Sequence, residues 1–206
     1  MLDKSPDQIL DRKLVNIQNE LREKIPNIVL CSEPFHKAEF LNKLINHVEE
    51  SIIFVDMDLL YTGYVESGII PKRDNVTIFH PTKENWKEEF TKIITKVSQE
   101  KFLVIIDSFN GVYNMFEDLE SAIFINSCIM LLSSLGKDSN SSIIITAMAR
   151  KKENEGWILT PGGKQIIKSA KTGVYFLKKI ENDLIICSID EDLKKIQNLS
   201  QMTSFS

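Results

Sequence analysis

The chain has 206 residues, 43% of them hydrophobic, which is enough for one compact domain with a substantial core. Its net charge of −4 excludes a general attraction to nucleic acid or to an anionic membrane surface, so either contact would need a local patch. Three widely spaced cysteines without a CxxC pair, and three histidines without ligand spacing, argue against a disulfide framework and a metal site.

The sequence shows no sign of a membrane or secretory role. No apolar run approaches the length of about 20 residues that a membrane-spanning helix needs. The first residues, MLDKSPDQILDRKL, are polar and charged, unlike a secretory signal. We therefore expect a cytoplasmic protein, or a nuclear one if the source is eukaryotic.

The apolar pattern divides the chain into an N-terminal helix (1–25), a core domain (26–192) and a flexible tail (193–206). Pro26 ends the first helix, and strands of buried type then alternate with amphipathic helices. In chain order we expect a strand at 28–31, a helix at 35–48, strands at 51–58 and 76–80, a helix at 84–98, a strand at 101–107, a helix at 117–135 and a strand at 141–149.

The remaining segments complete an α/β pattern. Residues 60–75 and 150–165 are expected to be loops, and 171–179 and 183–190 to be two strands of a hairpin. Strands that alternate with helices predict an α/β fold of three layers, with a mainly parallel sheet, helices on both faces and C-terminal antiparallel edge strands. Because such sheets bind ligands at the carboxyl ends of their strands, those ends are the places to look for chemistry.

The segment CSEPFHKA follows the first strand, where a nucleotide-binding fold places its phosphate loop, GxxxxGK[ST]. Placing Lys37 on the lysine of that pattern puts Cys31 and His36 at the two glycines and Ala38 at the hydroxyl. Glycines let the backbone wrap the phosphates, and the hydroxyl holds Mg²⁺. The alternative is an ordinary strand–turn–helix connection with Ser32 as the helix N-cap.

Acidic residues follow two further buried strands. FVDMD carries Asp56 and Asp58, where an acid could orient an attacking water; the alternative is a pair of solvated carboxylates. LVIIDS carries Asp107 and Ser108, and an apolar strand that ends in aspartate is the Walker B arrangement, which fixes a carboxylate beside Mg²⁺. The same pattern also occurs by chance in many α/β proteins.

Residues 150–171 hold six basic and two acidic side chains, so this segment has a net charge of +4 within an acidic chain. A basic loop with an aromatic residue could contact phosphates and stack a base. The alternative is a solvated loop whose tryptophan packs on its own domain. The candidate nucleic-acid-binding residues are Arg150, Lys151, Lys152, Trp157, Lys164 and Lys168.

The order of these segments over residues 26–192 resembles the ATPase core of the RecA/RadA/KaiC-type family, and the recombinase paralogues within it most closely. IIFVDMD is similar to the family strand that ends in Asp-x-Glu, and KFLVIIDSFNGVYN is similar to its Walker B strand. The stretch INSCIMLLSSLGKDSNSSIIITAM resembles the helix, loop and strand that end in Thr-Asn-Gln. TPGGKQIIKSAKTGVYFLKK is similar to the segment in which a proline and a Gly-Gly pair follow the DNA-binding loop.

The departures from the family pattern fall on its chemistry. The phosphate loop lacks its glycines and hydroxyl, Asp58 stands at the position of the catalytic glutamate, and Met148 stands at the polar sensor position. Because phosphoryl transfer depends on positioned charge, the resemblance with these losses implies a protein that is not an enzyme. Lys37, Asp58, Asp107 and Ser108 would form a degenerate nucleotide site without a cofactor, unless ATP and Mg²⁺ still bind there.

The resemblance thus implies a non-catalytic recombinase paralogue, an accessory in homologous recombination and DNA repair. Its partner would be a RecA/RadA-type recombinase, another paralogue or a second copy of itself, and residues 150–171 would contact single-stranded DNA. Two alternatives stay open. One is an assembly scaffold without a DNA role, as in the RecA-like ring of the Elongator sub-complex, and the other is a weak ATP-binding switch protein.

Overall fold

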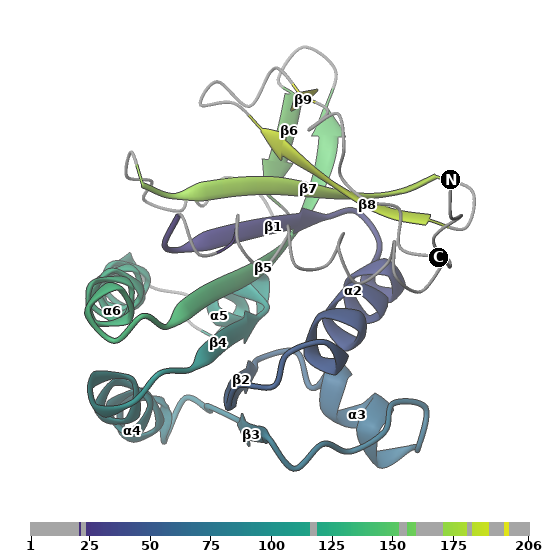
Figure 1. Ribbon diagram of the computed structural model, residues 1–206. Helices are drawn as coiled ribbons and strands as arrows, with labels where there is room; N and C mark the ends of the chain where they lie inside the picture. The colour runs from purple at the N-terminus through teal and green to yellow at the C-terminus, as the bar shows by residue number, and fades with distance from the viewer. Residues whose placement is uncertain are drawn as a thin grey trace, which may run out of the picture.

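The structure is a computed structural model that describes residues 21, 24–115, 119–152, 156–159, 171–180, 183–189 and 196–197. Its sheet has the strand order β3-β2-β4-β5-β1-β7-β8-β9, with β6 paired to β5 off this path (Figure 1). The strands are β1 (Asn27–Cys31), β2 (Ile52–Asp56), β3 (Val76–Phe79), β4 (Leu103–Asp107), β5 (Ser142–Lys152), β6 (Gly156–Leu159), β7 (Gly173–Ile180), β8 (Asp183–Ile189) and β9 (Ile196–Gln197).

The strands from β3 to β7 along this order run parallel, whereas β8 and β9 at one edge, and β6, pair antiparallel to their neighbours. The helices are α2 (Pro34–Asn46), α3 (Leu60–Glu66), α4 (Trp86–Gln99), α5 (Phe109–Met115) and α6 (Leu119–Asp138). The predicted mainly parallel sheet with antiparallel edge strands is confirmed.

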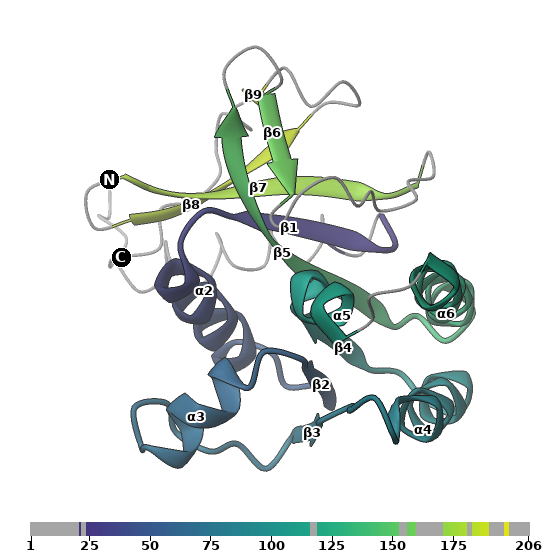
Figure 2. The same cartoon turned by 180° about the vertical axis from the view of Figure 1, so that it is seen from behind.

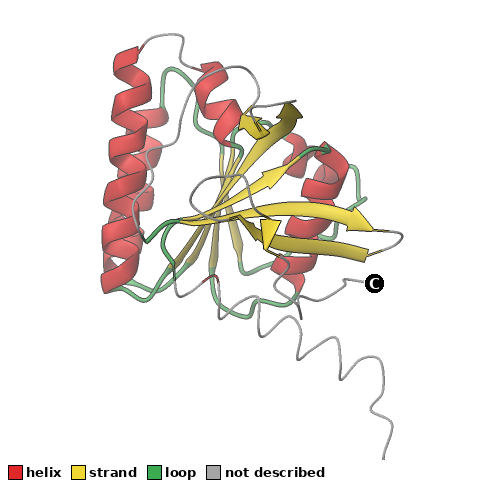
Figure 3. Cartoon of the chain, turned by 90° about the horizontal axis from the view of Figure 1, so that it is seen from above, coloured by secondary structure: helices red, strands yellow, loops and turns green. Residues whose placement is uncertain are grey.

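Helices cover both faces of the sheet, as Figures 2 and 3 show. Every residue of β1, β2 and β4 is buried, because successive side chains of a strand point to opposite faces and both faces are packed. Ile28 and Leu30 point into the core beneath α4, α5 and α6, and Val29 and Cys31 point into the core beneath α2 and α3. The three-layer α/β prediction is therefore correct.

Several local predictions differ from the structure. The expected loop at 60–75 contains α3, and the expected loop from 150 contains the end of β5, which continues to Lys152 and pairs with β6. Continuous strand pairing thus carries the basic segment further as sheet than its polar sequence indicates. The helix cap is Glu33 and not Ser32, because Pro34 occupies the first helical position and the N-cap is the residue before it.

The predicted terminal segments are only partly visible. Most of the expected N-terminal helix lies outside the described residues, although Leu21 is helical and packs in the core beneath α2. Within the expected tail, Ile196 and Gln197 form β9 against β8, and the rest of that segment lies outside the described residues. Among the helices in the described part of the chain, none is long and apolar enough to cross a membrane.

Candidate functional site

The candidate site lies where the carboxyl ends of β1, β2 and β4 meet, with β5 between β1 and β4. The parallel register places Asp56 beside Asp107, so the ends of β2 and β4 are level. α2 begins just after β1, and its first turn faces these strand ends. Sequence positions that lie far apart in the chain are therefore brought to one edge of the sheet.

Lys37, in the first turns of α2, is the central residue of this site. Its side chain is only 1% exposed, which is rare for a lysine unless a charged partner accompanies it into the interior. The Nζ atom lies 2.7 Å from Oδ1 of Asp107 and 3.1 Å from Oδ2 of Asp58. The three residues that the sequence proposed for a nucleotide site are thus joined to one another as an ion triad.

The electrostatics of the triad favour a charged lysine. Burial disfavours the ammonium form, but the carboxylates of Asp107 and Asp58 outweigh it, and the pKa of Lys37 lies above its ordinary value. With one ammonium and two carboxylates, the cluster satisfies the lysine internally. Lys37 could reach an external phosphate only by giving up these partners, and a divalent cation at the two carboxylates would have to displace the ammonium.

Asp107 is held from two sides. Its side chain is 2% exposed, and its Oδ1 accepts a hydrogen bond from the hydroxyl of Thr146 on β5 as well as the contact with Lys37. Burial raises the pKa of Asp107, and the Lys37 ammonium and the Thr146 hydroxyl oppose that rise. Asp58 differs, since its side chain is 27% exposed and it forms the solvent-facing side of the triad.

The connection from β1 to α2 does not form a phosphate cradle. Ser32 and Glu33 alone separate the strand from the helix, and residues 34–36, which would wrap the phosphates in a glycine-rich loop, already belong to α2. The backbone N–H of Lys37 donates to the carbonyl oxygen of Glu33 at 3.2 Å, as an ordinary helical bond. Cys31, at the position of the first glycine, is buried in the core.

Asp56 and Ser108 have local structural partners. Asp56 Oδ2 accepts hydrogen bonds from the backbone N–H and the hydroxyl of Thr62 in the first turn of α3, at 2.8 and 2.6 Å. The Ser108 hydroxyl accepts from the backbone N–H of Gly111 at 3.4 Å, which is the position of an N-cap for α5. In this geometry both side chains begin helices that border the site.

Two further residues position the site and were not singled out from the sequence. A Cβ at Gly111 would overlap the Asp58 carboxylate and lie 2.7 Å from the Cβ of Met57, so only glycine lets α5 approach the end of β2. Asn110 accepts from the backbone N–H of Met148 at 2.6 Å and joins α5 to β5. The FNG sequence after Asp107 was the available signal, because a glycine in a helical first turn indicates close packing.

The candidate nucleic-acid-binding residues are divided by the structure. Arg150 is exposed on β5, and the register places Lys151 opposite Trp157 on β6. Lys152 is the last residue of β5, opposite Gly156. Lys164 and Lys168 lie outside the described residues. A search of the described residues for three or more His, Cys, Asp or Glu side chains placed to hold a metal ion finds no such group.

Comparisons with known proteins show likeness in fold and not in sequence. No protein-family model matches the chain, and no curated protein matches it either. One solved structure, an isolated ATPase domain, matches over 95% of this chain and 94% of its own, with 8% identity and a TM-score of 0.52.

Two weaker matches are the crystal structure of the RadB recombinase and a DnaB-like replicative helicase solved for its interactions with primase. RadB has 14% identity over 78% of this chain and 79% of its own, with a TM-score of 0.48. The helicase has 10% identity over 91% of this chain and 62% of its own, with a TM-score of 0.49. The match to the isolated ATPase domain, together with the strand order, supports a RecA-like ATPase fold.

Proposed function

We propose that this protein is a non-catalytic recombinase paralogue with a RecA-like fold, which acts as an accessory in homologous recombination and DNA repair. The observation that carries the proposal is the ion triad. In an active site of this class a lysine and backbone N–H groups bind the nucleotide phosphates, and an aspartate holds Mg²⁺. Here the lysine, Lys37, neutralises that aspartate, Asp107, directly.

The loss of catalysis follows from charge and from space. Phosphoryl transfer requires a metal ion and several donors positioned around the γ-phosphate. The triad takes up the lysine and the two acids, and the short β1–α2 connection leaves no loop to surround a phosphate. A fold that keeps its packing without these parts would act through its surfaces.

An ATP hydrolysis assay, with and without single-stranded DNA, tests the absence of catalysis. The matched control is Asp107→Asn, which removes the Walker B carboxylate and would abolish any true activity. We expect the wild-type chain and the variant to release phosphate at the same background rate. Hydrolysis by the wild type that the variant lacks would show an active enzyme and overturn the proposal.

The DNA contact is assigned to the β5–β6 ribbon and the basic segment 150–171. Arg150 is exposed there, and the neighbouring Lys151 and Lys152 extend the same strand. Reversal of both lysines to glutamate should weaken binding of single-stranded DNA and reduce its salt dependence, because fewer counterions are released. The double variant Lys83→Glu/Lys96→Glu, with the same change in net charge elsewhere, is the control. Equal losses in both variants would remove the assigned contact.

The second function, an assembly scaffold without a DNA role, is favoured by an exposed apolar face on α6. Ile123, Phe124, Met130 and Leu131 are 56%, 47%, 40% and 47% exposed, and residues 121–136 carry no charge. Contiguous exposed apolar side chains mark association surfaces. The occupant would be a second copy of this chain. A dimer in light scattering that Leu131→Asp converts to a monomer, together with unchanged DNA binding in the lysine variant, would favour this function over the first.

A further inference from the structure

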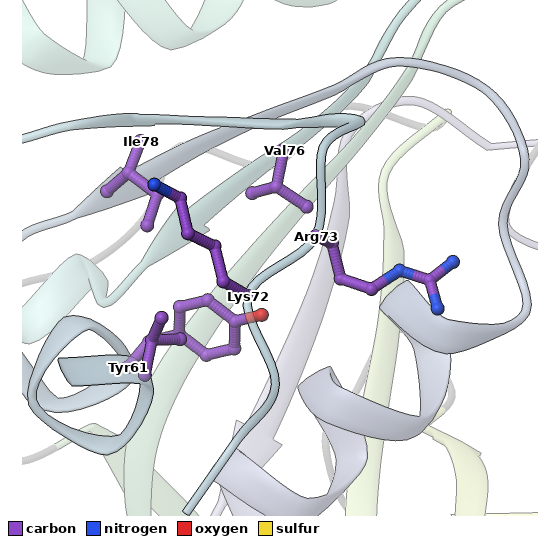
Figure 4. A pocket seen from close by; sticks show the side chains of 6 residues that line it. Tyr61, Lys72, Arg73, Val76 and Ile78 are labelled. Carbon is purple, nitrogen blue, oxygen red and sulfur yellow. The ribbon is translucent and has the colours of Figure 1, made fainter. Parts of the chain in front are cut away.

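A pocket of about 290 Å³ lies apart from the ion triad, between α3 and the edge strand β3. It is lined by Tyr61 and Val65 of α3, by Lys72 and Arg73 of the connection from α3 to β3, and by Val76 and Ile78 of β3 (Figure 4). None of these residues belongs to the triad or to the basic ribbon. The pocket is therefore independent of the function proposed above.

The floor of the pocket is apolar. Val76 and Ile78 alternate along β3, so their side chains share the face that α3 covers, and with Val65 they are only partly buried. The ring of Tyr61 stacks on Phe54 with 4.2 Å between the ring centroids, which fixes its position against the sheet. An apolar body placed here would remove these half-exposed side chains from water.

Three polar groups converge on the same pocket. Neither Lys72 nor Arg73 has a carboxylate within ion-pair distance among the described residues, and Arg73 uses Nη1 in a 3.3 Å hydrogen bond to Asn46. Tyr61 is 2% exposed, yet its hydroxyl makes no hydrogen bond to any residue in the described ranges. Figure 4 shows the Tyr61 ring beneath Lys72, with the hydroxyl turned toward the side on which Arg73 lies.

The charge around the tyrosine is positive at the pocket side. Burial raises the pKa of Tyr61, and the guanidinium of Arg73 partly opposes that rise. The hydroxyl thus stays protonated and able to donate. A buried donor without a partner, flanked by two unneutralised cations above an apolar floor, is matched by a ligand that supplies an anionic oxygen and an apolar body.

We propose that this pocket binds a small organic anion, with one carboxylate or phosphate group on an apolar body. The anionic group would accept from Lys72, Arg73 and the Tyr61 hydroxyl, and the body would lie on Val65, Val76 and Ile78. A guanidinium beside an ammonium binds both oxyanions, so the two groups are compared directly.

Calorimetric titration of the full chain with three probes tests the charge requirement. The probes are 3-phenylpropionate, 3-phenylpropyl phosphate and the neutral 3-phenylpropionamide. We expect at least one anion to bind, and the amide to bind about tenfold more weakly or worse, since it loses the charge-assisted hydrogen bonds. Comparison of the two anions identifies the preferred group. Equal binding of the amide, or no binding of any probe at millimolar concentration, would overturn the proposal.

Two variants locate the binding. Lys72→Ala/Arg73→Ala should weaken the better anion by about tenfold or more, whereas Lys96→Ala, an exposed lysine on α4 across the sheet, should leave it unchanged. Val76→Phe, on the solvent-accessible edge strand, should fill the pocket and weaken the anion and the amide alike. Anion affinity that survives both the cation variant and the filling variant would place the site elsewhere and refute the assignment.

Discussion

Replacement of Lys37 by methionine should destabilise the chain strongly, although it exchanges a charged residue for an apolar one of similar length. The reason is the partner that remains. Asp107 has a side chain only 2% exposed and would keep a single donor, Thr146. Breaking a buried ion pair from one side costs about 3–5 kcal/mol, because it leaves an uncompensated buried charge. For a domain of this size that corresponds to roughly 6–20 °C in melting temperature.

The destabilisation should depend on pH and should be reversible by a second substitution. Burial raises the pKa of Asp107, so in the variant the folded state takes up a proton more readily than the unfolded state does. The variant should therefore regain stability as the pH falls toward the ordinary aspartate range near about 4. In the double variant Lys37→Met/Asp107→Asn the buried charge is absent, and most of the loss should disappear at neutral pH.

Urea unfolding of the three proteins at pH 7 measures these free energies. Lys92→Met is the matched control, because Lys92 also contacts two carboxylates, Glu88 and Glu89, each at 2.8 Å, but on an exposed face of α4. Exposed pairs contribute little, so the control should unfold at the wild-type midpoint. A Lys37→Met midpoint as close to wild type as that of the control would refute the buried triad.

Further consequences follow from the same geometry. The carboxylates raise the Lys37 pKa against the opposing effect of burial, so the stability it contributes should be complete below about pH 10 and be lost as the pH rises through the folded pKa, as urea unfolding of wild type against Lys37→Met would show. Gly111→Ala should cost about 1–3 kcal/mol through overlap with the end of β2, whereas Gly63→Ala, with nothing within 4 Å of its Cβ, should be neutral or stabilising in thermal melts. Thr146→Val should cost about 1–3 kcal/mol, measured in urea, by removing a donor to Asp107. Burial raises the pKa of Cys31, so a disulfide exchange reagent should modify it only after denaturation, and fast labelling of the folded chain would contradict its burial.

The fold could be predicted because its strands state their burial in their own sequence. IIFVD and LVIID are continuous apolar runs of strand length, and such runs between amphipathic helices have few solutions other than a parallel sheet with both faces covered. The extension of β5 through Lys152 escaped prediction because its partner, β6, supplies the pairing that a polar sequence alone does not indicate.

The candidate site was predictable in its members but not in their arrangement. Lys37, Asp58 and Asp107 follow three different strands, and the topology alone brings those strand ends together. Whether the lysine side chain would turn to solvent or to the two acids depends on the packing of α2 against the sheet, which no spacing in the sequence encodes. Gly111 and Thr146 were missed for the same reason, since their roles consist of contacts with residues remote in the chain.

The central claim is that the lysine of the site is taken up by the protein's own carboxylates and does not bind nucleotide. Titration of the purified chain with a fluorescent ATP analogue and Mg²⁺, beside the Lys37→Ala variant, tests it most directly. The account predicts no saturable binding by the wild type up to millimolar nucleotide. Binding by the wild type that Lys37→Ala abolishes would contradict it, because the lysine would then contact phosphate and the protein would be a weak ATP-binding switch.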